Sequence, residues 1–416
     1  MSLRPVRGTV DLLPDEMRRH RRVIETARLA AERYGFGEMQ TPIVEFTDVF
    51  ARTLGDASDV VTKEMYTFED RGGERITLRP ENTAGVARAY ISGKLRDALP
   101  LKFFYAGPMF RYERPQKGRQ RQFHQIGVEL FGVPGPAADI EVIALGAQIL
   151  ADLNMLDRCV LHLNTLGDPA SRDAYRAALV EYFSAHKDKL SEDSLARLER
   201  NPLRILDSKD KGDRALVEAA PVFDDYLTAE AADLFAEVQA GLDNLGIAYD
   251  RDPRLVRGLD YYCHTAFEFI TESLGAQGTV IGGGRYDGLV ETMGGPATPG
   301  VGWAGGIERL VMLADLTMEP PKPPRPVALA PIGAAAEKRL AALAFQLRGQ
   351  GIAVDMGYSG NLKRRMARAS KLEARYAVIL GDNELEQGVA TLRNMDTGEQ
   401  EDVALDALGE RLGGVY

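Results

Sequence analysis

The segment 111–132, RYERPQKGRQRQFHQIGVELFG, combines a basic loop with two stretches that have the composition of strands. Alternate side chains of a strand share a face, so Gln125 and Glu129 lie on one surface with only Gly127 between them. Such a hairpin could hold a small polar ligand beside an anionic one, although a solvated sheet face is the simpler alternative. The opposite face is apolar and predicts a core contact for Ile126, Val128 and Leu130.

Three arginines lie beside chain features that favour anion binding. Arg111 ends the first strand of this hairpin, Arg257 stands in LVRGLDYY, and Arg309 opens a predicted helix after two glycines. A guanidinium binds phosphate through two parallel hydrogen bonds and stays charged, so these residues are candidate phosphate ligands. Taken singly, each could equally be a solvated or salt-bridged arginine.

Two segments, Arg111–Arg121 and Leu362–Arg375, are basic enough to suggest contact with nucleic acid. A solvated helix face is the default interpretation of the second segment. The candidate contacts are Lys117, Arg119, Arg121, Lys363, Arg364, Arg368 and Lys371.

Other common chemistries find little support. The chain has no GxxxxGK[ST] sequence, and Gly282–Gly284 continues as RYD, which breaks the dinucleotide-binding pattern. In a regular strand, the adjacent Cys263 and His264 would point to opposite faces, as would Cys159 and His162. We therefore expect no structural zinc site.

The elements that position these residues follow from hydrophobic periodicity. Asp168–Gly246 is rich in alanine and charge, which predicts a helical insertion between two parts of one sheet. The other expected elements are a helix at Met17–Tyr34, a hairpin of Glu64–Phe68 with Arg75–Arg79, a helix at Asn82–Ile91, a strand at Tyr261–Thr271, a glycine-rich hairpin at Gly278–Gly288, and Gly300–Gly306 leading into a helix.

A proline-rich stretch, residues 320–326, predicts a semi-rigid linker between two domains. Beyond it, 327–416 alternates strands and helices as a small α/β domain does. We expect strands at Val327–Pro331, Ile352–Met356, Tyr376–Leu380 and Val389–Arg393, and helices at Ala334–Arg348 and Leu362–Leu372.

The chain has 416 residues, 45% of them hydrophobic, which is ordinary for a globular protein of two or three domains. Its net charge of −10 argues against uniform coating of nucleic acid but allows local basic patches. Two distant cysteines, no signal peptide and no membrane-spanning run predict a cytoplasmic protein.

Taken in order, the motifs resemble one family, histidyl-tRNA synthetase, a class II aminoacyl-tRNA synthetase. YGFGEMQTPIVE looks like motif 1, FRYERPQKGRQRQFHQIGVE like motif 2, and GVGWAGGIERL like motif 3. TLRPENTAGVARA resembles the amino-acid-binding loop, and LVRGLDYY and GGGRYDGL resemble the two signatures of the histidine enzyme. The resemblance implies an α+β fold: a class II antiparallel sheet flanked by helices (1–319), with a helical insertion (about 168–246) and a C-terminal α/β anticodon-binding domain.

The resemblance also implies a role for each matched residue. Glu81, Thr83 and Gln125 would bind the α-amino group of histidine, and Glu129 and Tyr262, with Tyr261 beside them, would read its imidazole. Arg111 and Arg257 would act on the α-phosphate of ATP, and Arg309 on the γ-phosphate. ATP with Mg²⁺, L-histidine and tRNA(His) are the implied ligands, and motif 1 implies a homodimer; the resemblance assigns no Mg²⁺ ligands.

One residue departs from the family pattern, and one alternative function remains open. Gln120 replaces a common aromatic residue in the motif 2 loop, which bears on how the tRNA acceptor end is read. The alternative function is that of a synthetase-like regulatory subunit of ATP phosphoribosyltransferase. That paralogue typically lacks the C-terminal domain and tolerates decay of the ATP motifs. This chain keeps both the C-terminal domain and the ATP motifs.

Overall fold

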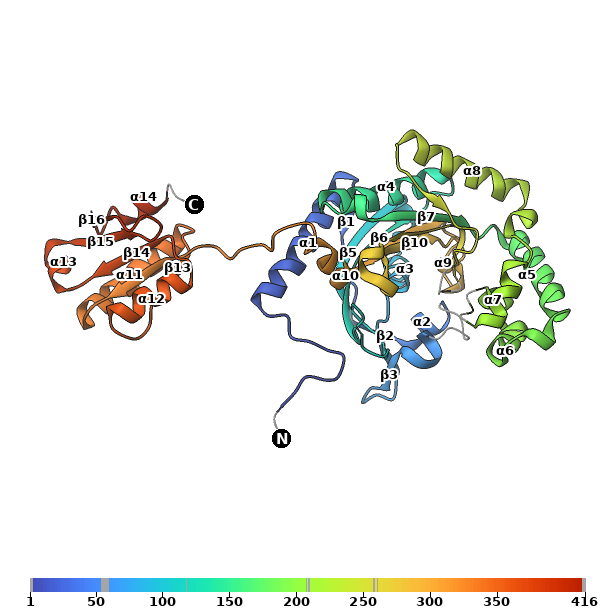
Figure 1. Ribbon diagram of the computed structural model, residues 1–416, viewed down its shortest axis with the longest axis horizontal. Coiled ribbons are helices and arrows are strands. Elements are labelled where there is room, and N and C mark those ends of the chain that lie inside the picture. The colour runs from blue at the N-terminus through green and yellow to red at the C-terminus, as the bar shows by residue number, and fades with distance from the viewer. Residues whose placement is uncertain are drawn as a thin grey trace. The chain divides into compact units, whose positions relative to one another are not determined.

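The structure, a computed structural model, describes residues 3–53, 60–116, 118–206, 208, 210–256, 259 and 261–413, without the side chains at 60, 62, 276 and 277. The chain divides into two compact units, Met1–Pro321 and Lys322–Tyr416. The division falls inside the proline-rich stretch, which Figure 1 shows as an extended segment. Each unit is described by itself.

The first unit is built on an eight-stranded sheet whose inner strands are all antiparallel, as predicted, with one parallel pair at each edge. Its order is β1 (Gly37–Glu38), β5 (Leu101–Phe110), β6 (Gln122–Phe131), β11 (Gly300–Gly306), β10 (Thr279–Arg285), β9 (Cys263–Ile270), β7 (Val160–Thr165) and β8 (Asp250–Arg251). The expected hairpin at Gly278–Gly288 was wrong, because β10 is a single strand that pairs with β9 on one side and β11 on the other.

The predicted parity of β6 is confirmed: Ile126, Val128 and Leu130 are fully buried in the main core. On the other face, two glycines leave room for larger neighbours. A Cβ on Gly127 would lie 2.3 Å from the Tyr105 hydroxyl, and one on Gly302 would lie 2.0 Å from the Glu129 carboxylate. These glycines therefore keep the space that the polar side chains of this face occupy.

Helices cover the apolar face of the sheet: α1 (Pro14–Arg33), α4 (Pro136–Asp152), α8 (Ala229–Asn244) and α10 (Ile307–Ala314). α4 packs against both α1 and α8, and Figure 1 shows α8 running over the sheet beside α4. α8 lies inside the predicted insertion, yet its Phe235, Val238 and Leu242 belong to the main core.

The remainder of the insertion has a core of its own, formed by residues such as Tyr175, Leu179, Phe183 and Phe223. Its helices are α5 (Pro169–Ser184), α6 (Glu192–Arg200) and α7 (Lys211–Glu218), with short 3₁₀ turns η4 (Lys187–Lys189), η5 (Pro202–Ile205) and η6 (Phe223–Tyr226). Asp213 accepts hydrogen bonds from Ser191, Ser194 and Ser208, and these bonds lower its pKa to about 2 although burial opposes them. This polar cluster ties three segments of the insertion together.

A small sheet in the order β2 (Val44–Phe46), β4 (Arg75–Leu78) and β3 (Tyr66–Glu69) lies near the polar face, and the predicted hairpin is confirmed as β3–β4. Helix α3 (Thr83–Ser92) follows it. Smaller elements are α2 (Thr47–Ala51), α9 (Leu289–Thr292), the π-helical turn η1 (Val60–Glu64) and the 3₁₀ turns η2 (Leu95–Ala98), η3 (Leu156–Arg158) and η7 (Glu272–Gln277).

The second unit has a five-stranded sheet in the order β13 (Val354–Asp355), β12 (Val327–Pro331), β14 (Tyr376–Leu380), β15 (Val389–Asn394) and β16 (Gln400–Ala404). Its helices are α11 (Ala334–Gly349), α12 (Leu362–Lys371), α13 (Asp382–Gln387) and α14 (Leu408–Gly413). The sequence did not predict β16, α13 or α14. Among the described residues, no helix in either unit is long and apolar enough to cross a membrane.

Candidate functional site

A cavity of about 420 Å³ opens on the polar face of the large sheet in the first unit. We call it the first cavity. The fold brings together here residues that lie up to 228 positions apart, between Glu81 and Arg309. The predicted site residues that line it are Glu81, Thr83, Arg111, Arg119, Gln125, Tyr261, Tyr262 and Arg309.

Glu129 is fully buried and does not line the first cavity, but it contacts Thr83, which does. Its Oε1 accepts hydrogen bonds from the hydroxyls of Thr83 at 2.7 Å and Tyr105 at 3.2 Å, and its Oε2 accepts one from Tyr286. Burial raises the pKa of Glu129 to about 8, even though these hydroxyls stabilise the ionised form. This carboxyl group therefore gains and loses its proton near neutral pH rather than in the acidic range of an ordinary glutamate.

Glu81 joins the first cavity to helix α3. Its two carboxylate oxygens accept hydrogen bonds from the backbone N–H groups of Thr83 at 2.6 Å and Ala84 at 2.9 Å. An acidic group is favourable at a helix N-terminus, where N–H groups lack partners within the helix. Burial nevertheless raises the pKa of Glu81. The same contacts fix the orientation of the carboxylate that lines the cavity.

Gln125 offers an unpartnered acceptor. Its Oε1 is buried and has no hydrogen-bond partner among the described residues. A buried carbonyl oxygen without a partner costs about 1–3 kcal/mol, so its presence on a cavity wall favours a ligand that brings an N–H group.

Two tyrosines that contact Glu129 were missed by the sequence analysis. Tyr105 enters from β5, and Tyr286 follows β10 inside the GGGRYDGL motif. The ring of Tyr286 also lies edge-on to that of Tyr261, with 5.7 Å between centroids. Burial raises the pKa of all three phenols well above the ordinary value, so they remain hydrogen-bond donors at neutral pH.

Three arginines also line the first cavity. Arg119 lies 2.8 Å from Glu113, and Arg111 donates to the backbone carbonyl of Pro80 at 2.9 Å. Arg309 donates to the carbonyl oxygens of Gly118 at 3.3 Å and Thr279 at 2.7 Å. Burial and the neighbouring Arg119 lower the pKa of Arg309, which remains a cation at neutral pH. These guanidinium groups suit a polyanion.

Two predicted site residues, Arg257 and Lys117, lie outside the described residues. Arg121 is described but does not line the first cavity. Its guanidinium instead stacks on the Tyr112 ring, 3.8 Å from the ring centroid.

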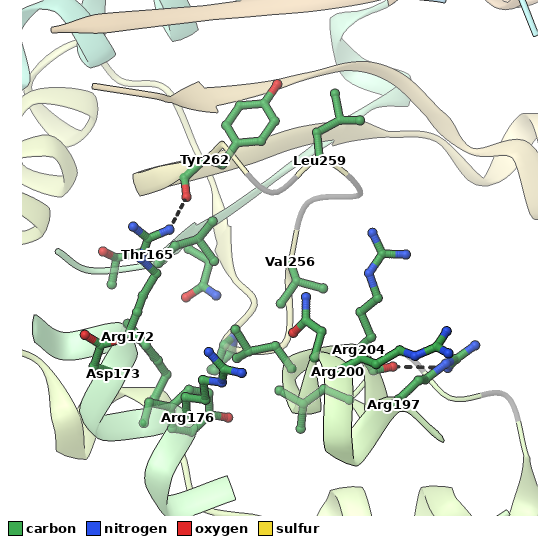
Figure 2. Close-up of a pocket in the computed structure, with 18 residues that line it drawn as sticks. Thr165, Arg172, Asp173, Arg176, Arg197, Arg200, Arg204, Val256, Leu259 and Tyr262 are labelled. Atoms are coloured by element: carbon green, nitrogen blue, oxygen red, sulfur yellow. Dashed lines mark hydrogen bonds between the residues drawn. The ribbon is translucent and has the colours of Figure 1, made fainter. Parts of the chain in front are cut away.

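A second cavity of about 520 Å³ lies on the other side of Leu259 and Tyr262, residues that line both cavities. Figure 2 shows arginines of the helical insertion around it, with Leu259 and Tyr262 on the opposite side. Arg172 donates to the Tyr262 carbonyl at 2.9 Å. Among the described lining residues, the only acid is Asp173, against Arg172, Arg176, Arg197, Arg200 and Arg204.

In the second unit, the predicted basic face of α12 is exposed at Lys363, Arg364 and Arg368. Arg368 forms two hydrogen bonds, at 2.7 and 2.8 Å, with Asp355, which partly neutralises it. Arg365 is buried instead and contacts Pro331 and Glu337, so it serves the fold.

The expected divergence of Cys263 and His264 was wrong. His264 has a left-handed backbone conformation, with φ of 47°, and the pairing of β9 with β10 shifts register at this point. As a result, both side chains approach Asp287. The pair Cys159 and His162 is not part of such a cluster among the described residues.

Comparison with known proteins supports a single family. The family model described as "Histidyl-tRNA synthetase" matches residues 8–310, and that described as "Anticodon binding domain" matches residues 326–413. The "Histidine–tRNA ligase" of Rhodospirillum rubrum is 62% identical over 411 residues, covering 99% of both chains. That of Gluconacetobacter diazotrophicus is 56% identical over 414 residues, covering 100% of this chain and 99% of its own. The crystal structure of apo S. aureus histidyl-tRNA synthetase superposes with a TM-score of 0.83 at 37% identity, covering 99% of this chain and 100% of that one.

Proposed function

Because the chain belongs to the histidyl-tRNA synthetase family, we propose that the first cavity is where it activates histidine with ATP. Its activity is the ATP-dependent joining of histidine to tRNA. The observation that carries the site assignment is one cavity lined by the Glu81 carboxylate, the Gln125 amide and the three arginines Arg111, Arg119 and Arg309. The first two groups match an amino acid, and the arginines match a polyphosphate.

In the proposed complex, the α-amino group of histidine binds Glu81, Thr83 and the unpartnered oxygen of Gln125. The imidazole is read by Glu129, framed by Tyr261 and Tyr262. An apolar side chain of similar size would bring no N–H group to Glu129, whose other partners are hydroxyls, and a site built to hydrogen-bond its substrate rejects such analogues strongly. This accounts for amino-acid selectivity.

In the proposed reaction, the histidine carboxylate attacks the α-phosphorus of ATP in line, and pyrophosphate leaves. Charge builds up on the phosphoryl oxygens, so positioned cations supply most of the catalysis. We assign Arg111 and Arg257 to the α-phosphate and Arg309 to the γ-phosphate. No proton transfer is required, so a general base is not part of the proposal.

We further propose that Mg²⁺ accompanies ATP. Besides Glu81, the carboxylates of Glu113, Glu268 and Glu308 line the first cavity, and carboxylate oxygens are the ligands this cation prefers. The donor set therefore fits the ion. Bound there, Mg²⁺ would neutralise charge on the phosphates.

For tRNA we propose three contact regions: the motif 2 loop with Lys117, Arg119 and Arg121, the exposed face of α12 with Lys363, Arg364 and Arg368, and the arginines of the second cavity. The third region lies in the helical insertion, where five guanidinium groups around one cavity offer a surface suited to phosphates. We also propose a homodimer built by motif 1, and a cytoplasmic location.

The regulatory-subunit alternative accounts less well for the chain. Curated relatives named as ligases match along their full length, and residues 326–413 match an anticodon-binding domain. In addition, Arg111 and Arg309 both reach the cavity.

Pyrophosphate exchange into ATP tests the proposed function, run with histidine and then with each other amino acid. Exchange that depends on histidine alone is the expected result. Absence of exchange, with histidine still bound in equilibrium dialysis, would contradict the adenylation site and favour the regulatory subunit.

A further inference from the structure

Cys263, His264 and Asp287 place one ligand atom each within 4.8 Å of the other two. The first two residues begin β9, and Asp287 follows β10. The left-handed conformation of His264 accompanies a break in pairing, where Arg285 lies opposite Cys263 but Gly284 lies opposite Ala266. This break is what brings adjacent side chains of a strand to one point.

The donor atoms of this cluster have few other hydrogen-bond partners. Nδ1 of His264 is buried without a hydrogen-bond partner among the described residues. Cys263 is a free thiol whose sulfur accepts only a long contact of 3.4 Å from the Asp287 backbone N–H. The two bonds that Asp287 accepts, from Arg285 and from the Gly300 N–H, both go to Oδ1.

The local charge also suits a divalent cation. Arg285 forms a fully buried ion pair with Asp139, so that its charge is already compensated. The Asp287 carboxylate and a Cys263 thiolate would then balance two positive charges.

We propose that Cys263, His264 and Asp287 bind Zn²⁺. Sulfur, imidazole nitrogen and carboxylate oxygen form a donor set that zinc favours and that magnesium does not. Three protein ligands leave the fourth tetrahedral position to water. Binding replaces the thiol proton with the metal, so one proton passes to solvent for each zinc bound.

The position gives this site a connection to the first cavity. Cys263 directly follows Tyr262, and Asp287 directly follows Tyr286, which donates to Glu129. A metal bridge would therefore clamp the segment of Tyr262, which lines the first cavity, to that of Tyr286, which contacts Glu129. The binding proposal itself does not depend on the proposed function.

A second cluster, His20, His124 and Glu308, also lies within the same distance limit among the described residues. It is a weaker zinc candidate because His124 Nδ1 lies 2.8 Å from Glu308, which also accepts from the His124 backbone N–H. It also lacks a thiolate. It therefore serves as an internal control.

The test uses the full-length, tag-free chain stripped of metal and titrated with Zn²⁺ against a chromogenic chelator. We expect one equivalent bound per chain, and Co²⁺ in its place should show thiolate-to-metal absorption. Cys263→Ser and His264→Asn should each weaken binding by more than the roughly 10–100-fold typical of losing an outer-shell partner. Asparagine tolerates positive φ, so it removes the imidazole while keeping the backbone conformation.

Matched controls separate this site from others. Cys159→Ser removes the other cysteine, and His20→Asn disrupts the second cluster; both should keep wild-type affinity. Zn²⁺ should also raise Tm of the wild type but not of Cys263→Ser, since a ligand stabilises the state that binds it. Equal binding by wild type and Cys263→Ser, loss of binding in His20→Asn, or no bound equivalent at all would overturn the proposal.

Discussion

The Thr83 hydroxyl donates a 2.7 Å hydrogen bond to Glu129, and through it the first turn of α3, which lines the first cavity, is joined to this buried carboxyl group. The backbone N–H of the same residue donates to Glu81 at 2.6 Å. One threonine thus orients both carboxyl groups of the proposed histidine pocket. Its two partners lie 48 positions apart in the sequence but are held in one hydrogen-bonded chain.

Glu129→Gln should raise KM for histidine and leave KM for ATP near its wild-type value. The amide keeps the shape but loses one of the two acceptor oxygens, and a hydrogen bond of this kind is worth about 0.5–1.5 kcal/mol, which corresponds to roughly 2- to 13-fold. Steady-state pyrophosphate exchange measures both constants. Glu113→Gln, which changes the partner of Arg119 in the same cavity, is the matched control and should affect ATP more than histidine. Equal effects of Glu129→Gln on both substrates would remove Glu129 from the amino-acid pocket.

Glu129→Gln should also change how stability depends on pH. The pKa of Glu129 is about 8 in the folded chain against an ordinary 4.5, so the folded state holds a proton that the unfolded state releases between these values. Its contribution is complete below about pH 4.5 and is lost as pH rises to about 8, by at most about 1.4 kcal/mol per pH unit. Glutamine is neutral throughout, so the variant should gain on the wild type as pH rises.

Trp303 makes this measurement specific. It is the single tryptophan and is buried in the main core of the first unit, so its fluorescence reports that unit alone. Urea unfolding at pH 5, 7 and 9 gives the two profiles. Parallel profiles would mean that the carboxyl group titrates at an ordinary pKa.

Arg285→Ala should destabilise the first unit by about 3–5 kcal/mol, because it leaves Asp139 charged and buried without a partner. The Nε of Arg285 lies 3.1 and 3.2 Å from the two Asp139 oxygens, which joins β10 to α4. Arg33→Ala breaks an exposed pair with Asp152 and should cost at most about 1 kcal/mol. If both variants unfold at the same urea concentration, the buried pair contributes no more than a surface one.

The sequence predicted the polar face of β6 because strand parity is a local property, and burial of Ile126, Val128 and Leu130 confirms it. It did not reveal Tyr105 and Tyr286, since their contact with Glu129 depends on which strands are neighbours. Cys263 and His264 were misjudged for a related reason: a regular strand separates adjacent side chains, but a register shift brings them together. Periodicity alone carries no signal for such a shift.

The clustering of arginines around the second cavity also could not be predicted from sequence periodicity. Its arginines are scattered over Arg172–Arg204 within a segment that reads as a mixed-charge helical region. Only the packing of α5, α6 and η5 gathers them beside Tyr262. By contrast, the basic face of α12 could be predicted, because residues close in sequence share one helix face.

Charge reversal in the second cavity tests its proposed role in tRNA binding. Arg200 is exposed and lines this cavity, so Arg200→Glu should weaken tRNA binding and reduce the salt dependence of the binding constant by at least about one counterion. Arg214→Glu makes the same charge change on α7 of the insertion but outside the cavity, and should have the smaller effect. Filter binding of tRNA across a salt series gives both quantities.

Because the net charge changes equally in the two variants, a difference between them comes from position. Identical slopes and affinities would show that only the overall field of the insertion matters, and would remove the second cavity from the tRNA path.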